Sequence, residues 1–187
     1  MNIKEAVQKI QEIAKQKGAN STKIISIKNI FVENWVRQKC EYGCKGYARH
    51  FTCPPYSPTP EETKGRLIDY EIALLIEFDG FKQRKQQQKI HEVMFELERE
   101  AFLMGLIKAF SYSAGPCRSC GSCLAEKVKV PNKFSKKLCA NQKKARPSME
   151  ACGINVFKTV KNAGYQISVV QKEKNECFKG FGLLLLY

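Results

Sequence analysis

Histidines, acidic residues and long apolar stretches are all scarce in this chain of 187 residues. The stretch 1–18 mixes Lys and Glu with scattered apolar residues, so it lacks the continuous apolar region of a signal peptide. The apolar run 182–187 is far shorter than the roughly 20 residues that a membrane-spanning helix needs. We therefore expect a cytoplasmic protein without a membrane helix or a membrane partner.

The scarcity of histidine matters because cysteine is abundant. The chain has nine cysteines, but only His50 and His91 could add imidazole ligands. Nine thiols in a reducing compartment rarely form a disulfide framework, and an odd number cannot pair completely. Metal binding by thiolates is the better interpretation, and thiolates favour iron–sulfur clusters, zinc or copper(I).

The scarcity of acidic residues leaves a formal net charge of +14, from 32 Lys and Arg against 18 Asp and Glu. A surplus of this size indicates attraction to something anionic, and nucleic acid is one candidate. Alternatively, the formal count treats the thiols as neutral, whereas ligating thiolates are anionic and would lower the charge of the metal-loaded protein. Both interpretations stay open.

The predicted elements indicate one α/β domain over residues 1–187. Apolar periodicity and capping residues predict helices at 3–17, 59–68, 82–104, 148–152 and 155–162. Alternating or compact apolar runs predict strands at 23–27, 70–78, 106–113, 167–170 and 181–186. The strand–helix–strand order over 70–113 predicts a parallel pair with a right-handed crossover. We therefore expect a single-domain α/β sandwich with a central, mostly parallel sheet and cysteine-rich metal-binding loops.

One cysteine group has the spacing of a cluster-binding motif. Cys117, Cys120 and Cys123 follow one another at two-residue gaps, and Cys139 comes after a fifteen-residue loop. A C-x2-C-x2-C turn can direct three sulfurs at three corners of a cubane, while a distant cysteine supplies the fourth ligand. Zinc also accepts four thiolates, but its sites usually consist of two separated C-x2-C pairs. We expect a 4Fe-4S cluster here, with zinc as the alternative.

Another group has three thiols, Cys40, Cys44 and Cys53. Four prolines between residues 54 and 60 exclude regular helix there, so we expect this group to lie on loops. Three ligands are one short of a closed set. An open position on iron or zinc would indicate chemistry rather than a structural role.

Several groups could complete this second metal site. His50 is one candidate, although an exposed loop imidazole is the favoured interpretation of this residue. Cys152 and Cys177 are others, although a lone cysteine is more often a small buried hydrophobe. A small molecule could also occupy the remaining position.

The loop between Cys123 and Arg146 is strongly basic, with seven lysines against Glu126 alone. It could form a basic rim for a small anionic substrate, an acidic redox partner or nucleic acid. A solvated loop whose lysines offset cluster charge is slightly favoured. Nucleic acid is the less favoured partner, because only Phe134 offers a stacking surface there.

Together these motifs resemble an uncharacterised family of predicted metal-binding proteins, cysteine-rich domains of unknown function found in methanogenic archaea and anaerobic bacteria. The resemblance is carried by Cys40-x3-Cys44, Tyr47, Thr52-Cys53-Pro54-Pro55-Tyr56, Pro58-Thr59, Gly115-Pro116-Cys117-x2-Cys120-x2-Cys123, the stretch 145–151 and Gly153-Ile154. It implies that the metal-site positions are Cys40, Cys44, Cys53, Cys117, Cys120, Cys123 and Cys139. It names no reaction.

The chain departs from that family's pattern in two places. Asn155 stands where an Asp is usual, and the loop before Cys139 is longer and more basic. Ligation should survive both changes, whereas a role for that Asp in substrate or proton handling is put in doubt.

Three functions remain open at this point. The chain could be an iron–sulfur protein of redox or electron transfer, with the three-cysteine group as a second site. It could be an enzyme that binds a small substrate at an open metal position. It could also be a zinc-stabilised nucleic-acid-binding module.

Overall fold

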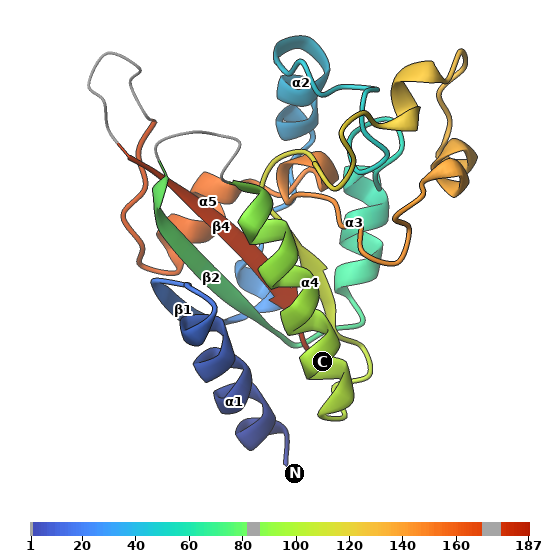
Figure 1. Ribbon diagram of the computed structural model, residues 1–187. Helices are drawn as coiled ribbons and strands as arrows, with labels where there is room; N and C mark the ends of the chain where they lie inside the picture. Colours follow the sequence, from blue (N-terminus) through green and yellow to red (C-terminus); the bar gives the residue numbers. More distant parts are fainter. Residues whose placement is uncertain (1, 82–86, 170–176) are drawn as a thin grey trace.

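A computed structural model describes residues 2–81, 87–169 and 177–187 of the chain (Figure 1). Its four strands form one sheet in the order β1-β2-β4-β3. The strands are β1 (Ser21–Ser26), β2 (Ile72–Phe81), β3 (Phe110–Tyr112) and β4 (Phe178–Leu185). Every neighbouring pair is antiparallel.

The prediction of a mostly parallel sheet is therefore wrong, and the position of β4 explains why. β2 and β3 do run in the same direction, because each is antiparallel to β4. The C-terminal strand lies between them, so they form a split βαβ unit rather than a hydrogen-bonded parallel pair. The apolar run of β4 has the composition of a buried strand, but composition does not say between which neighbours that strand inserts.

One face of the sheet is covered by two helices, α1 (Ile3–Gln16) and α4 (Gln88–Leu103), which pack side by side (Figure 1). Alternate β2 residues, Leu74 and Ile76, are fully buried in this layer. The other face buries Ala73 and Leu75. Because both faces of β2 are covered, the strand has a continuous apolar run instead of an alternating one.

Two glycines in β4 let α4 lie directly on the sheet. A Cβ atom at Gly180 would collide with Ile90, and one at Gly182 would collide with Met94. Glycine inside a strand commonly marks such a close approach. The core between sheet and helix therefore depends on the absence of these two side chains.

The second face is covered by short elements. They are α3 (Pro60–Leu67), the 3-10 helix η5 (Glu150–Cys152) and α5 (Val156–Asn162), which supply buried residues to the core on this side. A capping box of Thr59 and Glu62 opens α3, as the sequence predicts.

Most predicted elements are present with shifted ends. The expected helix 82–104 is described from Gln88 onward, and residues 82–86 lie outside the described residues. The expected strand 106–113 shortens to β3. The strand expected at 167–170 is wrong for 167–169, which form no regular structure, and Val170 lies outside the described residues.

A helix that the sequence analysis missed, α2 (Asn34–Gly43), packs against η5 beyond one end of the sheet. Figure 1 shows α2 grouped there with the segments that precede α3 and follow β3. The latter include the 3-10 helices η3 (Leu124–Lys127) and η4 (Lys133–Leu138). None of the helices in the described part of the chain has the length and apolar character needed to cross a membrane.

Candidate metal centre

The seven predicted cysteine ligands all lie in this region beyond the sheet. Cys40 is in the last turn of α2 and Cys44 is the C-cap residue of that helix. The expectation that the whole first group lies on loops is thus wrong for Cys40, because the stretch before Gly43 contains no proline. Cys53 lies in the loop before α3, and the second group follows β3, with Cys139 at the end of η4.

The three thiols of the first group are close enough for their charges to interact. Burial, followed by the charges of Cys44 and Cys40, raises the pKa of Cys53 to about 12. Burial, followed by the charge of Cys44, raises the pKa of Cys40 to about 11. Both thiols are therefore protonated at neutral pH in the metal-free protein. A metal that binds them has to displace their protons, so binding is pH-dependent.

The four thiols of the second group are also neighbours. Burial raises the pKa of Cys139, and the charges of Cys123, Cys117 and Cys120 raise it further. The Asn141 amide donates a hydrogen bond of 3.0 Å to the sulfur of Cys120. The Cys117 sulfur lies 3.3 Å from the Ser119 hydroxyl. In the second contact the Cys117 thiol donates to the hydroxyl, whereas the Asn141 contact is a hydrogen bond donated to sulfur, the kind that tunes a thiolate-bound cluster.

The two groups adjoin each other through Cys117 and Thr52. The backbone N–H of Cys117 donates to the Thr52 hydroxyl at 3.2 Å, and Thr52 directly precedes Cys53. The charge of Cys117 is also one of the causes that raise the pKa of Cys53. The structure therefore places both groups on the same side of the molecule.

A small hydrophobic cluster joins the two cysteine loops. Phe51 and Tyr56 meet edge to face, with ring centroids 5.0 Å apart, and pack with Ala125. Cys123 and Cys139 are half-buried against this cluster. It is separate from the two clusters that cover the sheet, so the cysteine loops have a core of their own.

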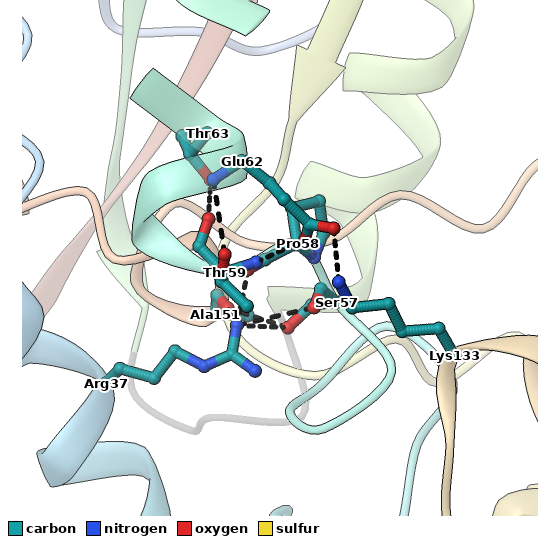
Figure 2. Close-up of polar contacts among 8 residues, drawn as sticks. All are labelled: Arg37, Ser57, Pro58, Thr59, Glu62, Thr63, Lys133 and Ala151. Carbon is teal, nitrogen blue, oxygen red and sulfur yellow. Dashed lines mark hydrogen bonds and ion pairs between the residues drawn. The ribbon is translucent and has the colours of Figure 1, made fainter. Parts of the chain in front are cut away.

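Arg37 on α2 ties three segments together (Figure 2). Its Nη1 donates to the carbonyl oxygens of Ser57, Pro58 and Ala151, and the Ser57 hydroxyl donates to Ala151 at 2.7 Å. α2, the loop before α3 and η5 are thus held in one arrangement around Cys40. No sequence pattern marks this role, because an arginine in a helix is ordinarily read as a solvated charge.

Two polar atoms beside the first group are buried and have no hydrogen-bond partner among the described residues: His50 Nδ1 and Glu150 Oε2. His50 is half-buried rather than exposed, and burial together with the Arg118 charge lowers its pKa, so the ring is neutral at pH 7. Burial raises the pKa of Glu150. His50 is a candidate on sequence grounds, whereas Glu150 is not, because only the fold shows that its Oε2 atom is buried without a partner.

The other predicted candidates have different environments. Cys152 is fully buried in the core on the α5 side of the sheet, as expected for a small hydrophobe. Cys177 is exposed, so that interpretation is wrong for it. His91 is buried, and its Nε2 donates to the carbonyl oxygens of Ala114 and Gly115 at 3.0 and 3.2 Å, a structural role.

The thiols are neighbours without forming a closed coordination shell. Across residues 2–81, 87–169 and 177–187, no three His, Cys, Asp or Glu side chains are arranged so that they could hold a metal ion. The donors nevertheless fit a thiolate-bound metal chemically, since each group brings at least three thiols within reach of one another's charge, on segments that hydrogen bonds and a local core hold together.

Comparison with known proteins agrees with this chemistry. A family model described as "Predicted metal-binding protein (DUF2284)" matches residues 23–186, nearly the whole chain. No curated protein matches the chain, and no solved structure does.

Proposed function

Because the chain belongs to this family of predicted metal-binding proteins, we propose that it is an iron–sulfur protein that acts in redox or electron transfer. Cys117, Cys120, Cys123 and Cys139 would hold a 4Fe-4S cluster. The three-cysteine group, Cys40, Cys44 and Cys53, would hold a second metal. A cluster of this type supplies one-electron transfer when bound.

The observation that carries this proposal is the position of Cys139, which packs with Cys123 against the cluster of Phe51, Tyr56 and Ala125, and whose pKa the charges of all three cysteines of the C-x2-C-x2-C run raise after burial. Fifteen residues separate Cys139 from that run, so the fold, and not local sequence, brings the fourth thiol to the other three. Ferredoxin-type sites use the same division between a tight turn and a distant cysteine.

The surroundings of the thiols also suit an anionic cluster. Ser119, Gly121 and Ser122 are exposed and small, which leaves their backbone N–H groups accessible to sulfur. The Asn141 amide already donates to Cys120. These contacts would stabilise thiolate charge and set the potential of the site.

The lysine-rich loop supports an acidic redox partner or a small anionic substrate. All seven of its lysines are exposed: Lys127, Lys129, Lys133, Lys136, Lys137, Lys143 and Lys144. Of these seven lysines, only Lys133 has an ion-pair partner within the described residues, Glu62 on α3 (Figure 2). Unneutralised positive charge next to a cluster would attract an acidic surface and speed encounter with it.

Anaerobic purification and chemical analysis test the cluster. The full chain should be brown and contain iron and acid-labile sulfide, and Cys139→Ser should lose most of both. Cys177→Ser is the matched control, since this exposed cysteine is not among the thiols coupled to either group. Stoichiometric zinc without sulfide in the native protein would contradict the proposal and favour the zinc-stabilised nucleic-acid-binding module.

An enzyme is the alternative that a specific observation favours. Cys44 is exposed, so a metal held by the first group would be accessible to a small substrate. Spectra of the metal-loaded protein should then respond to added thiol or cyanide. Spectra that never respond would leave electron transfer as the function.

A further inference from the structure

The three-cysteine group lacks a fourth protein ligand, and the structure narrows the candidates. Cys152 belongs to the sheet core and Cys177 is exposed, and neither is among the thiols whose charges raise the pKa of Cys40 or Cys53. Two other donor atoms beside the group are buried and have no hydrogen-bond partner among the described residues, one on His50 and one on Glu150.

Glu150 lies against Cys40. η5, which begins with Glu150, packs on α2, and the Cys40 sulfur is 3.9 Å from the Glu150 carbonyl oxygen. The negative charge of Glu150 also affects Cys40, so the carboxylate itself is close to this thiol.

Ser148 and the backbone of Glu150 itself give this carboxylate hydrogen bonds, but no cation pairs with it within the described residues and its Oε2 atom has no partner there. Arg37 on α2 donates through Nη1 to the carbonyl oxygens of Ser57, Pro58 and Ala151, and within the described residues no ion pair joins it to Glu150. A buried carboxylate that no cation pairs with and that leaves one oxygen without a hydrogen bond destabilises the fold. A metal cation on the adjacent thiols would remove that destabilisation.

The competing atom, His50 Nδ1, differs in two respects. An unpartnered neutral imidazole nitrogen costs much less than an unpartnered carboxylate, so its isolation calls less strongly for a cation. His50 also lies toward Cys44 and Pro116, since a Cβ at Gly46 would contact all three residues. His50 therefore lies between Cys44 and the segment that leads into the second group, whereas Glu150 is on the side of Cys40.

We propose that Glu150 supplies the fourth ligand, through Oε2, to the metal held by Cys40, Cys44 and Cys53. The inference rests on the proposed function, because it requires metal at the three-cysteine group. Carboxylate oxygens bind zinc and iron, but they are harder ligands than thiolates. Glu150 would thus complete the coordination of the metal when no substrate is bound. It would also be the ligand that an incoming anion or thiol displaces, so the same site could be fully coordinated and still bind a substrate.

The test measures metal retention in the anaerobically purified full chain during competition with a chelator. Glu150→Gln keeps the shape and removes the anionic ligand, so the metal of the first site should be lost at least about tenfold faster. Glu150→Cys should retain the metal and shift its electron paramagnetic resonance or charge-transfer spectrum, because a thiolate replaces the oxygen. Glu126→Gln, an exposed acid on η3, is the matched control and should match the parent.

Melting of each metal-free variant separates ligand loss from misfolding. Metal-free Glu150→Gln should melt within a few degrees of the metal-free parent; if it does not fold, the spectrum of Glu150→Cys decides. Retention unchanged in Glu150→Gln, or lost instead in His50→Gln, would overturn the proposal. If the three-cysteine group holds no metal, the parent and the Cys40→Ser/Cys44→Ser variant should contain equal amounts of metal. If only the assignment of Glu150 is wrong, the parent should contain more metal than that variant.

Discussion

The sheet and the cysteine region are ordered by different means. In β2, residues 73–76 are all fully buried between helices on both faces. In the described stretch 115–147, Ala125 is the single buried residue. Ordering a residue costs roughly 1–2 kcal/mol of backbone entropy, so burial of this extent cannot by itself stabilise the second region. Ion pairs, Arg37 and, in our proposal, metal–thiolate bonds take the place of a large core.

Substitutions in the sheet core and in the small cluster of the cysteine loops test this contrast directly. Leu75→Ala should lower the free energy of unfolding by about 2–5 kcal/mol, since a fully buried side chain leaves a cavity between sheet and α5. The iron content of the protein that remains folded should not change. Urea denaturation followed by circular dichroism, with iron analysis of the folded fraction, measures both.

Phe51→Ala is the counterpart in the small cluster of the cysteine loops. It should speed iron release through local opening, while the denaturation midpoint of the sheet changes little. If both variants altered the same property, the two regions would form one cooperative unit and the contrast would fail.

Protonation of His91 offers a second, smaller perturbation at the junction of the two regions. This residue is on α4, and its ring donates to the chain that leads into Cys117. Burial lowers its pKa to about 4, against 6.5 in the unfolded chain. Between these values the unfolded chain binds a proton that the folded protein does not. Stability is therefore full above pH 6.5 and falls toward pH 4, by about 3 kcal/mol at most.

His91→Gln should remove this dependence. The measurement is the denaturation midpoint of the metal-free protein at several pH values between 4 and 7. An equally steep fall in the variant would show that another group controls the acid sensitivity.

The same contrast between the sheet and the cysteine region decides how much of each could be predicted from the sequence. α1, α3 and β2 were recognisable because apolar period, caps and burial agree locally along the chain. The position of β4 between β2 and β3 was not recognisable. There Gly180 and Gly182 meet side chains of α4, a contact between segments about 90 residues apart in the sequence. The cysteine positions came from spacing, which records ligand chemistry directly and remains a prediction.

The roles of Arg37 and Glu150 could not be predicted from the sequence. The carbonyl partners of Arg37 and the unpartnered Oε2 atom of Glu150 depend on how the loops assemble. Their sequence neighbours carry no distinguishing pattern. A charged residue in a helix or at its start is usually solvated, and only the fold shows which charge is buried.

Replacing Arg37 tests whether polar contacts hold the first cysteine group. Arg37→Lys keeps the charge but cannot reach three carbonyl groups with a planar fork. We expect a loss of about 1.5–3 kcal/mol in unfolding free energy and faster metal release from the three-cysteine site. Arg118→Lys, an exposed arginine beside the second group, is the control. Lower stability with unchanged metal release would mean that Arg37 serves the fold alone.

The smallest effect is expected from Asn155→Asp, which restores the residue usual in the resembled family. The Asn155 side chain accepts from the N–H of Lys158, capping α5, and donates to Glu33 Oε2 at 2.8 Å. An Asp would keep the cap, but it would set a second carboxylate against Glu33 and lose the donor. Asn155 is buried, but Glu33 and Lys158 are partly exposed and pair with each other at 2.8 Å, so the melting temperature should fall by only about 2–4 °C. Glu33→Gln combined with Asn155→Asp should recover part of that fall, since the new amide can donate in the reverse direction. Metal content should be the same in the parent and both variants, because this network anchors the N-cap of α2 and not the turn that carries Cys40. Iron lost in Asn155→Asp would show instead that α2 transmits changes at its N-cap to the metal centre.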